Sequence, residues 1–442
     1  MSSTGNGEPR GTASDTPPTT DDIRWPPSQH GLQTVAVSRT FSAWVTSGAD
    51  FLGVAGPLPV DVPWWAEVEP VVARLEHALG VPVFVLRLLE TDGGESGRDG
   101  HVTYHVEALE RPRGGVLDRR PVDRGLLHTD DALRSPWARA DGLRELLDWA
   151  SRTLTALGRP VTGPVEQRRT WNLAGLFRLP TGQGPVWLKA TPRFASDEAA
   201  VIAAFGRWDT DLVPTVLAAG ERRVLLEHIP GRDCWEADAA TVESGVRRFV
   251  SAQAALTDRR PPGLRDRRDG LLGALVRELL DGRVELDITD EERDRARELT
   301  FRWERLAECG LPDTLVHADF HPGNWRSDGR PPVVVDFADA HWGNPVLDCL
   351  RLYDFLPEAV RPTAVRVWAD AWKAHAPASD PARALALAKP LAHLAYAVRY
   401  QEFLDGIEAS ERPYHEGDPA AVIRRALRCA AHPSLASVEV AD

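Results

Sequence analysis

The sequence predicts an α+β protein with two lobes, a small antiparallel β-sheet lobe and a larger, mainly helical lobe, preceded by an α/β accessory domain. Three observations support this fold class. Short strand-like runs gather between residues 165 and 230, helical periodicity dominates residues 231–442, and residues 31–135 mix both patterns. The chain has 442 residues, a length that predicts about two or three domains instead of a single core.

The composition is that of an ordinary globular protein, with 43% hydrophobic and 26% charged residues. Its apolar runs are too short for a transmembrane helix. The first residues carry neither a basic nor an apolar signal segment, so we expect a cytoplasmic location. The four cysteines lie far apart and form no CxxC pair, which disfavours a zinc ribbon and a disulfide framework.

The net charge and the lysine content limit the classes of binding partner and indicate one candidate site residue. A formal net charge of −13 argues against non-specific binding to nucleic acid or to an anionic membrane. It is compatible with a cationic small molecule. The chain has three lysines, Lys189, Lys373 and Lys389, among 52 basic residues. Lysine supplies a compact, rotatable charge that arginine does not, and Lys189 stands out because it lies in the apolar strand-like run VWLKA.

The N-terminal part contains no catalytic constellation. Residues 1–30 are rich in Ser, Thr, Pro and Gly, and we expect a disordered tail. Residues 31–135 predict one helix that stops at Gly80, and several strands. We interpret them as an accessory or packing domain, with a substrate-capping role as the alternative. Residues 136–164 contain an amphipathic linker helix.

Residues 165–230 predict the small sheet lobe. Three strand-like runs follow one another, VEQRRTW, LAGLFRLP and GPVWLKATP, and TGQG predicts a hairpin between the second and third. A helix follows, with Ser196 as its expected N-cap. Residues 231–442 then read as mainly helical, and Thr289 with Glu292 forms a capping-box signature.

The stretch LVHADFHPGNW holds His317, Asp319 and His321 within five residues. Such a cluster could in principle supply zinc ligands, as in a metal-dependent hydrolase. No HExxH signature is present and no matching further ligand stands nearby, so this alternative is weak.

Phosphoryl transfer from ATP fits the same stretch better. It needs a carboxylate for the attacking hydroxyl, oxygen ligands for magnesium and a cation for the phosphates. Asp319 and Asn324 are five residues apart, as in the protein-kinase loop H-R-D-x-x-x-x-N. Asp336 follows a predicted hairpin that turns at Asp328-Gly329 and returns the chain, so Asn324 and Asp336 could hold one Mg²⁺.

The cation should lie upstream on a strand. Lys189 lies on the third strand-like run, and Glu198 follows nine residues later in the first turn of the next helix. A helix packed on the sheet would bring Glu198 to Lys189 as an ion pair that aims the ammonium group at the phosphates.

Together, HADFHPGN and VVVDFADAHWGNPVLD resemble the aminoglycoside phosphotransferase family, the small-molecule branch of the protein-kinase-like fold. The resemblance covers about residues 165–430 and is most specific over 315–350. It implies a kinase that uses ATP and Mg²⁺ to phosphorylate a hydroxyl of a small molecule, an aminoglycoside, an amino sugar or a related metabolite. The net charge and the short apolar runs separately predict no nucleic-acid or membrane partner.

The resemblance also assigns roles by position. It implies the catalytic base at Asp319, the magnesium ligands at Asn324 and Asp336, the phosphate-steadying pair at Lys189 and Glu198, the adenine-facing hinge at Glu227, a loop-bracing histidine at His317 and a loop-holding carboxylate at Asp348.

The sequence departs from the family pattern at three places. Ala318 replaces a common glycine, a change that is tolerated if the φ of this residue is negative. Asn344 replaces the aspartate of Gly-Asp-Pro. The first hairpin, RTWNLAGL, has Gly175 alone where the family's loop is rich in glycine. This last departure keeps open an alternative function, a non-catalytic pseudokinase-like module that binds a ligand.

The stretch from Glu402 to Asp418 carries six carboxylates against one arginine. It has two interpretations, a solvated acidic face or a carboxylate cluster that holds an amine-bearing acceptor.

Overall fold

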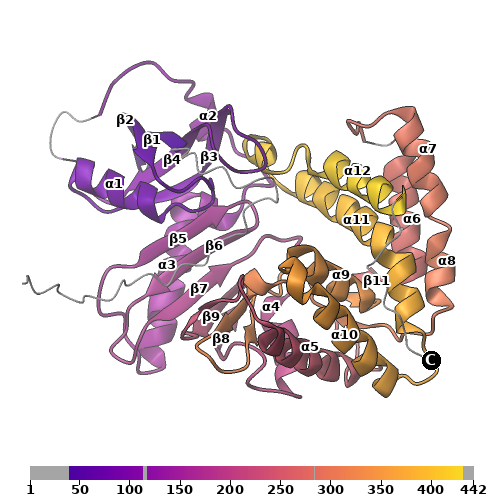
Figure 1. The fold of residues 1–442 in the computed structure, drawn as a ribbon. Coiled ribbons are helices and arrows are strands. Elements are labelled where there is room, and N and C mark those ends of the chain that lie inside the picture. The colour runs from indigo at the N-terminus through magenta and orange to yellow at the C-terminus, as the bar shows by residue number, and fades with distance from the viewer. Residues whose placement is uncertain (1–38, 113–116, 283, 432–442) are drawn as a thin grey trace, which may run out of the picture.

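The computed structural model describes residues 39–112, 117–282 and 284–431. The tail predicted at residues 1–30 lies outside this part. The α+β, two-lobed arrangement is confirmed, with an N-terminal β region placed before the sheet lobe (Figure 1). No helix in the described ranges is both long and apolar enough to cross a membrane.

The N-terminal region is a four-stranded mixed sheet in the order β2-β1-β4-β3. Its elements are β1 (Arg39–Ser47), β2 (Asp50–Val60), α1 (Glu69–Leu79), β3 (Val83–Asp92) and β4 (His101–Ala108). Helix α1 packs on one face through buried apolar side chains at i, i+4 and i+8, which are Val71, Leu75 and Leu79. Gly80 ends α1 as expected, with φ of 67°, and its N–H donates to the Glu76 carbonyl.

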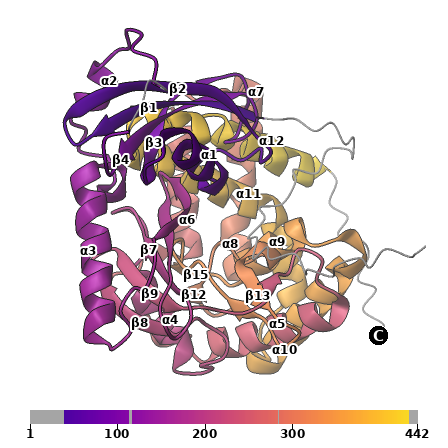
Figure 2. The same cartoon turned by 90° about the vertical axis from the view of Figure 1, so that its left-hand side faces the viewer.

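The sheet lobe is a five-stranded antiparallel sheet in the order β5-β6-β7-β9-β8. Its strands are β5 (Glu166–Trp171), β6 (Ala174–Leu179), β7 (Val186–Ala190), β8 (Val216–Gly220) and β9 (Arg223–Glu227). The TGQG hairpin is confirmed between β6 and β7. Helix α3 (Ala140–Ala156) packs its apolar side chains onto the sheet (Figure 2).

Helix α4 (Glu198–Gly206) joins the sheet lobe to the helical lobe, because its buried side chains belong to the helical lobe's core. The expected N-cap was wrong by one residue. Asp197 caps the helix by accepting from the Ala200 N–H, and the Ser196 hydroxyl instead donates to the Ala340 carbonyl. Ser196 therefore ties the start of α4 to the segment that follows Asp336.

The helical lobe carries the C-terminal half of the chain. Its helices are α5 (Ala239–Ala254), α6 (Asp269–Leu280), α7 (Asp290–Leu299), α8 (Arg302–Ala307), α9 (Val346–Phe355), α10 (Arg361–His375), α11 (Pro381–Gly406) and α12 (Asp418–Ala431). The capping box at Thr289 and Glu292 is confirmed at the start of α7.

Short strands carry the loops between these helices. One three-stranded sheet joins β11 (Asp266–Arg267), β15 (His341–Gly343) and β12 (Thr314–Val316), and the other joins β10 (Arg232–Asp233), β13 (Trp325–Ser327) and β14 (Val333–Val334).

Strand β3 connects the N-terminal sheet to the sheet lobe. Its side chains alternate, so Val83 and Val85 enter the core under α1 whereas Phe84 and Leu86 enter the core of the five-stranded sheet. Gln167 of β5 replaces a strand partner at this edge. Its amide donates to the Val85 carbonyl (2.7 Å) and accepts from the Val85 N–H (2.8 Å). The two sheets therefore share a continuous packing contact.

The acidic stretch between α11 and α12 reaches back to the N-terminal sheet (Figure 1). Glu408 is buried and lies 2.8 Å from Arg134 and 3.3 Å from Arg87 of β3. Glu411 is buried too, and its carboxylate accepts from the Leu88 N–H at 2.7 Å. The interpretation as a solvated acidic face is therefore wrong for these two carboxylates, and the same contacts remove them as partners for an amine. They hold the N-terminal sheet on the helical lobe.

Burial raises the pKa of Glu411 from an ordinary 4.5 to about 8, with the neighbouring Glu408 adding to the shift. The native state therefore keeps a proton that the unfolded chain loses above pH 4.5. The free energy of unfolding should fall by up to about 1.4 kcal/mol per pH unit between these two pKa values, then level off. Glu411→Gln should remove this loss, so its stability should exceed that of wild type by a margin that grows as the pH rises from 4.5 to about 8.

Denaturant unfolding at several pH values measures the effect. Glu416→Gln is the matched control, because Glu416 is exposed in the same segment. Parallel pH profiles for Glu411→Gln and wild type would contradict the assignment.

Candidate active site

The loop after β12 is held by a carboxylate on α9. Asp348 accepts from the backbone N–H groups of His317 (3.0 Å) and Ala318 (2.8 Å), and from the Gln253 amide (2.8 Å). Asp348 is 1% exposed, and burial raises its pKa to about 6 despite these donors. A buried carboxylate with three donors fixes the backbone that leads into Asp319.

Ala318 has a φ of +70°, so the condition under which alanine is easily tolerated at this position, a negative φ, is not met. A positive φ explains why glycine is common at this position in the resembling family, since a Cβ crowds the carbonyl in this region. The conformation persists because the Ala318 N–H is bound by Asp348 and its carbonyl accepts from the Tyr396 hydroxyl. Strain of this kind concentrates at functional loops.

Asp319 lies in a dense hydrogen-bond network. Its Oδ1 accepts from two nitrogens of Arg351, at 2.7 and 2.8 Å, and its Oδ2 accepts from the Asn324 amide at 3.0 Å and lies 3.3 Å from His321 Nε2. Burial alone would raise the pKa of the Asp319 carboxyl. His321 and Arg351 outweigh it and hold that pKa well below its ordinary value of 3.8. Asp319 is therefore a charged carboxylate at neutral pH.

Arg351 is the site residue that sequence reasoning missed. Its guanidinium lies between the rings of Phe355 and Tyr396, with its central carbon 4.3 and 4.4 Å from their centroids. The aromatic pair fixes the planar fork that holds Asp319. A local signal existed, because Arg351 follows Asp348 by three residues on α9 and so lies on a neighbouring face of the helix. Tyr396 comes from α11 and had no local signal.

The hairpin predicted between Asn324 and Asp336 is present as β13 and β14, which pair Trp325 with Val334. It returns the chain to the loop, because the Val335 N–H donates to the Asn324 carbonyl at 2.8 Å. Asp336 follows with a positive φ of 66°. The short connection thus places the second carboxylate beside the first loop.

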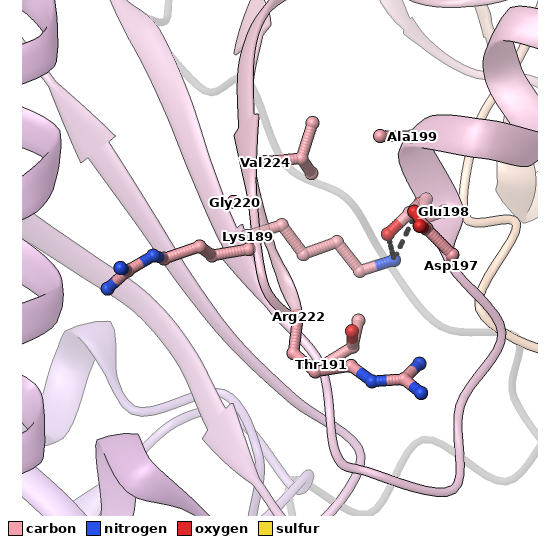
Figure 3. A pocket seen from close by; sticks show the side chains of 9 residues that line it. Lys189, Thr191, Asp197, Glu198, Ala199, Gly220, Arg222 and Val224 are labelled. Atoms are coloured by element: carbon pink, nitrogen blue, oxygen red, sulfur yellow. Dashed lines mark hydrogen bonds and ion pairs between the residues drawn. The ribbon is translucent and has the colours of Figure 1, made fainter.

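Lys189 of β7 meets two carboxylates. Its Nζ lies 3.0 Å from Glu198 of α4 and 2.7 Å from Asp336 (Figure 3 draws the pair with Glu198). Glu198 also accepts from the Phe337 N–H at 3.0 Å. Burial disfavours the ammonium, but Asp336 and Glu198 outweigh it and raise the pKa of Lys189. The expected Lys189–Glu198 ion pair is present, and Asp336 is joined to it.

The two histidines of the loop are engaged in structural bonds. His317 Nδ1 accepts from the Asp319 N–H, so its other nitrogen donates to the Val335 carbonyl at 2.9 Å. His321 Nδ1 accepts from the Gly323 N–H, and its ring stacks on Trp235 with centroids 5.1 Å apart. Within the described ranges, no group of three or more His, Cys, Asp and Glu side chains is arranged to hold a metal. The zinc interpretation therefore has no ligand set in this loop.

Magnesium needs fewer protein groups, and the donor set near Asp336 fits it. Magnesium prefers oxygen and is commonly held by one or two protein side chains plus water and phosphate. The Asn324 amide nitrogen donates to Asp319, so its carbonyl oxygen is the atom left for a cation. The Asp336 side chain is 44% exposed, and the Lys189 ammonium holds the pKa of its carboxyl below the ordinary value of 3.8, against the opposing charge of Asp319.

The hairpin between β5 and β6 turns at Asn172 and Leu173, where the resembling family has its phosphate loop. Gly175 does not open a path for phosphate. A Cβ there would lie 2.9 Å from the Trp137 ring, so the glycine makes room for that ring. Asn172 Oδ1 lies 3.0 Å from His415 Nε2, and His415 Nδ1 lies 3.2 Å from Asp418. This turn is tied to the helical lobe.

Glu227 ends β9, where the resemblance implies the adenine-facing hinge. Its carboxylate forms a two-pronged ion pair with Arg159, at 2.8 and 2.9 Å, and its N–H donates to the Thr215 carbonyl. The side chain is therefore occupied by the segment that follows α3. A contact with a nucleotide at this position would have to come from backbone groups.

Asn344 has a partner that explains why it is not aspartate. Its amide donates to Asp269 at 3.1 Å, and burial raises the pKa of Asp269 to about 7. An aspartate at position 344 would set two buried carboxylates against each other.

Residues 177–387 match the model of the family described as APH, the phosphotransferase enzyme family. No curated protein matches.

Solved structures with a similar fold include a choline/ethanolamine kinase family protein from Mesorhizobium loti (18% identity, TM-score 0.47, covering 64% of this chain and 98% of that one). Others are a macrolide 2′-phosphotransferase from Brachybacterium faecium (20%, 0.44, 62% and 98%) and a choline kinase from Streptococcus pneumoniae (13%, 0.46, 64% and 99%). Residues 177–387 thus belong to the phosphotransferase enzyme family, within a protein-kinase-like α+β fold that an additional N-terminal region precedes.

Proposed function

We propose that this protein is a small-molecule kinase that transfers the γ-phosphoryl group of ATP to a hydroxyl of its acceptor with the help of Mg²⁺. One observation carries the proposal. The hairpin after Asn324 brings Asp336 to the Lys189–Glu198 pair, while Asn324 itself bonds Asp319. A charged carboxylate, a cation and two oxygen donors are the parts that phosphoryl transfer requires.

Asp319 serves as the group that orients the acceptor hydroxyl and takes its proton. The hydroxyl oxygen forms a bond to the γ-phosphorus, the bond from that phosphorus to the bridging oxygen of ADP breaks, and the proton passes to Asp319. Its low pKa suits a late proton transfer in a loose transition state. Since Arg351, Asn324 and His321 surround the carboxylate, the acceptor hydroxyl must replace one of these neighbours.

Lys189 steadies the α- and β-phosphates, and Glu198 aims it from α4. Backbone groups beside Glu227 contact the adenine. Asn324 and Asp336 hold Mg²⁺, which neutralises charge on the phosphates when it is bound. Asp348 and His317 are positioning residues, because they hold the loop that carries Asp319.

The alternative is a pseudokinase-like module that binds a ligand without catalysis. The turn at Asn172 favours it, because that turn is tied to His415 and has no run of glycines for close phosphate contact. The complete set of Asp319, Asn324, Asp336 and Lys189 favours the enzyme.

Calorimetric titration with ATP and Mg²⁺, followed by an assay of ADP release with a panel of hydroxyl compounds, distinguishes the two. The kinase should release ADP at a rate that an acceptor stimulates, and a phosphorylated acceptor should appear in equal amount. Nucleotide binding without stimulated release across the panel would favour the module, and absence of nucleotide binding would contradict both.

A further inference from the structure

A small cavity of about 40 Å³, in part open to solvent, adjoins the loop that carries Asp319. Ala318, the residue before Asp319, forms part of its wall, and so does Asp339, three residues after Asp336. Tyr396 lines it as well, and its hydroxyl donates to the Ala318 carbonyl. The cavity therefore touches both segments on which the proposed chemistry depends.

Three arginines line this cavity, against two carboxylates. The arginines are Arg265, Arg267 and Arg399, and the carboxylates are Asp339 and Glu402. His341 adds no charge at neutral pH, because burial lowers its pKa to about 3. The fixed charge of the lining is therefore positive, although the whole chain carries −13.

Both carboxylates are already paired within the wall. Asp339 accepts from Arg399, and Glu402 pairs with Arg267 and lies 3.1 Å from Arg399. An amine that entered the cavity would have to compete with guanidinium groups for each of them. This arrangement disfavours a polycationic amino sugar.

Arg265 is different from the other two arginines. Within the described part of the chain its guanidinium donates to two backbone carbonyls, those of Phe194 and Asp339 (the latter at 3.2 Å), and it has no ion pair with a carboxylate. Burial and the neighbouring Arg399 lower its pKa to about 9, as expected for a cation without full compensation. An oxyanion would supply the missing partner.

Two further features suit a polar ligand. His341 Nε2 is buried and has no hydrogen-bond partner in the described structure, although neutral imidazole can donate or accept at that atom. The remaining wall is apolar, from Leu272, Leu347, Ala395 and Val398, which fits the carbon skeleton of a small molecule.

We propose that this cavity is the acceptor site and that it selects a hydroxyl compound bearing an oxyanion, a carboxylate or a phosphate, with Arg265 as the residue that recognises it. The inference rests on the proposed kinase function. It differs from the cationic acceptor with which the net charge of the chain is compatible. Arg265 is a specificity residue, and it takes no part in the bond changes at Asp319.

The test compares small hydroxyl compounds that carry a negative, a zero or a positive charge. Calorimetry with the ATP-free protein should detect binding of glycerate or glycerol 3-phosphate, and weaker or no binding of glycerol and choline. The carboxylate and phosphate arms separate the two kinds of oxyanion. Arg265→Gln should lower the affinity for the preferred anion by about tenfold or more, the usual effect of losing a hydrogen bond from a charged group.

Arg366→Gln is the matched control, because it removes one positive charge from an exposed site on α10. It should leave probe binding unchanged. The inference is overturned if choline binds as well as the anions, if neither anion binds, or if Arg265→Gln binds the anion like wild type. ATP affinity is measured for the wild type and the same variants. If the wild type does not bind ATP, the kinase proposal fails, and this result is independent of the binding of the probes.

Discussion

Asp319→Asn should lower kcat by roughly 10²- to 10⁴-fold, the range that a positioned general base contributes. The amide keeps the shape of the carboxylate but cannot accept the hydroxyl proton. ATP affinity should stay close to wild type, because Asp319 faces the acceptor and Lys189 faces the phosphates. Steady-state assays with saturating ATP and acceptor measure kcat, and calorimetry measures the affinity for ATP. Turnover near the wild-type rate would remove Asp319 from the role of base.

The same variant should also lose stability, because Asp319 neutralises Arg351 at a site where both side chains are less than 15% exposed. Breaking such a buried pair from one side costs about 3–5 kcal/mol. The double variant Asp319→Asn with Arg351→Gln should recover part of this loss, since no unpaired charge remains. It should not recover turnover. Arg351→Gln alone keeps the base and should therefore stay active, which separates loss of catalysis from loss of the fold.

The Lys189–Glu198 pair and the return of Asp336 to Asn324 could be predicted from the sequence because each depends on a short connection, whereas the contact of Lys189 with Asp336 joins residues 147 positions apart. The β13–β14 hairpin spans few residues. Glu198 lies in the first turn of α4, which follows the strand of Lys189 after a short loop. Spacing and hairpin geometry then restrict where the side chains can lie. The same holds for the stop at Gly80.

Contacts between distant segments could not be predicted in this way. From the sequence the acidic stretch is either a solvated face or a cluster that holds an amine, yet Glu408 and Glu411 are buried against strand β3, more than 300 residues earlier. Charge composition cannot show which carboxylates meet an arginine from another domain. From the sequence, Gly175 is the one glycine of a possible phosphate loop. In the structure its neighbour is the ring of Trp137, from the segment before α3.

Ala318 shows a third kind of limit. The resemblance places a common glycine at this position, and alanine is easily tolerated there only if its φ is negative. Alanine tolerates a positive φ when surrounding bonds hold the peptide, and here Asp348 and Tyr396 supply them from two helices. Neither helix is adjacent to the loop in sequence, so the compensation is visible only in the assembled fold.

Asp336→Asn should lower kcat by roughly 10³-fold, because magnesium contributes several kcal/mol to phosphoryl transfer and this carboxylate is the one charged oxygen ligand in the proposed pair. The Mg²⁺ concentration for half-maximal rate should rise, and calorimetry should show that Mg²⁺ no longer strengthens ATP binding as it does in wild type. Asp328→Asn is the matched control, since Asp328 lies at the exposed turn of the same hairpin. An unchanged Mg²⁺ requirement in Asp336→Asn would exclude Asp336 as a ligand.

The stability of Asp336→Asn should differ from that of Asp319→Asn, and the reason lies in their partners. Lys189 retains Glu198 at 3.0 Å when Asp336 loses its charge, so no cation is left unpaired. The Asp336 side chain is 44% exposed, and ion pairs with that much solvent contribute about 1 kcal/mol or less. Denaturant unfolding should therefore distinguish the two variants. The free energy of unfolding should fall strongly in Asp319→Asn and only slightly in Asp336→Asn. Equal losses would mean that Arg351 finds another partner, or that Lys189 depends on Asp336 more than on Glu198.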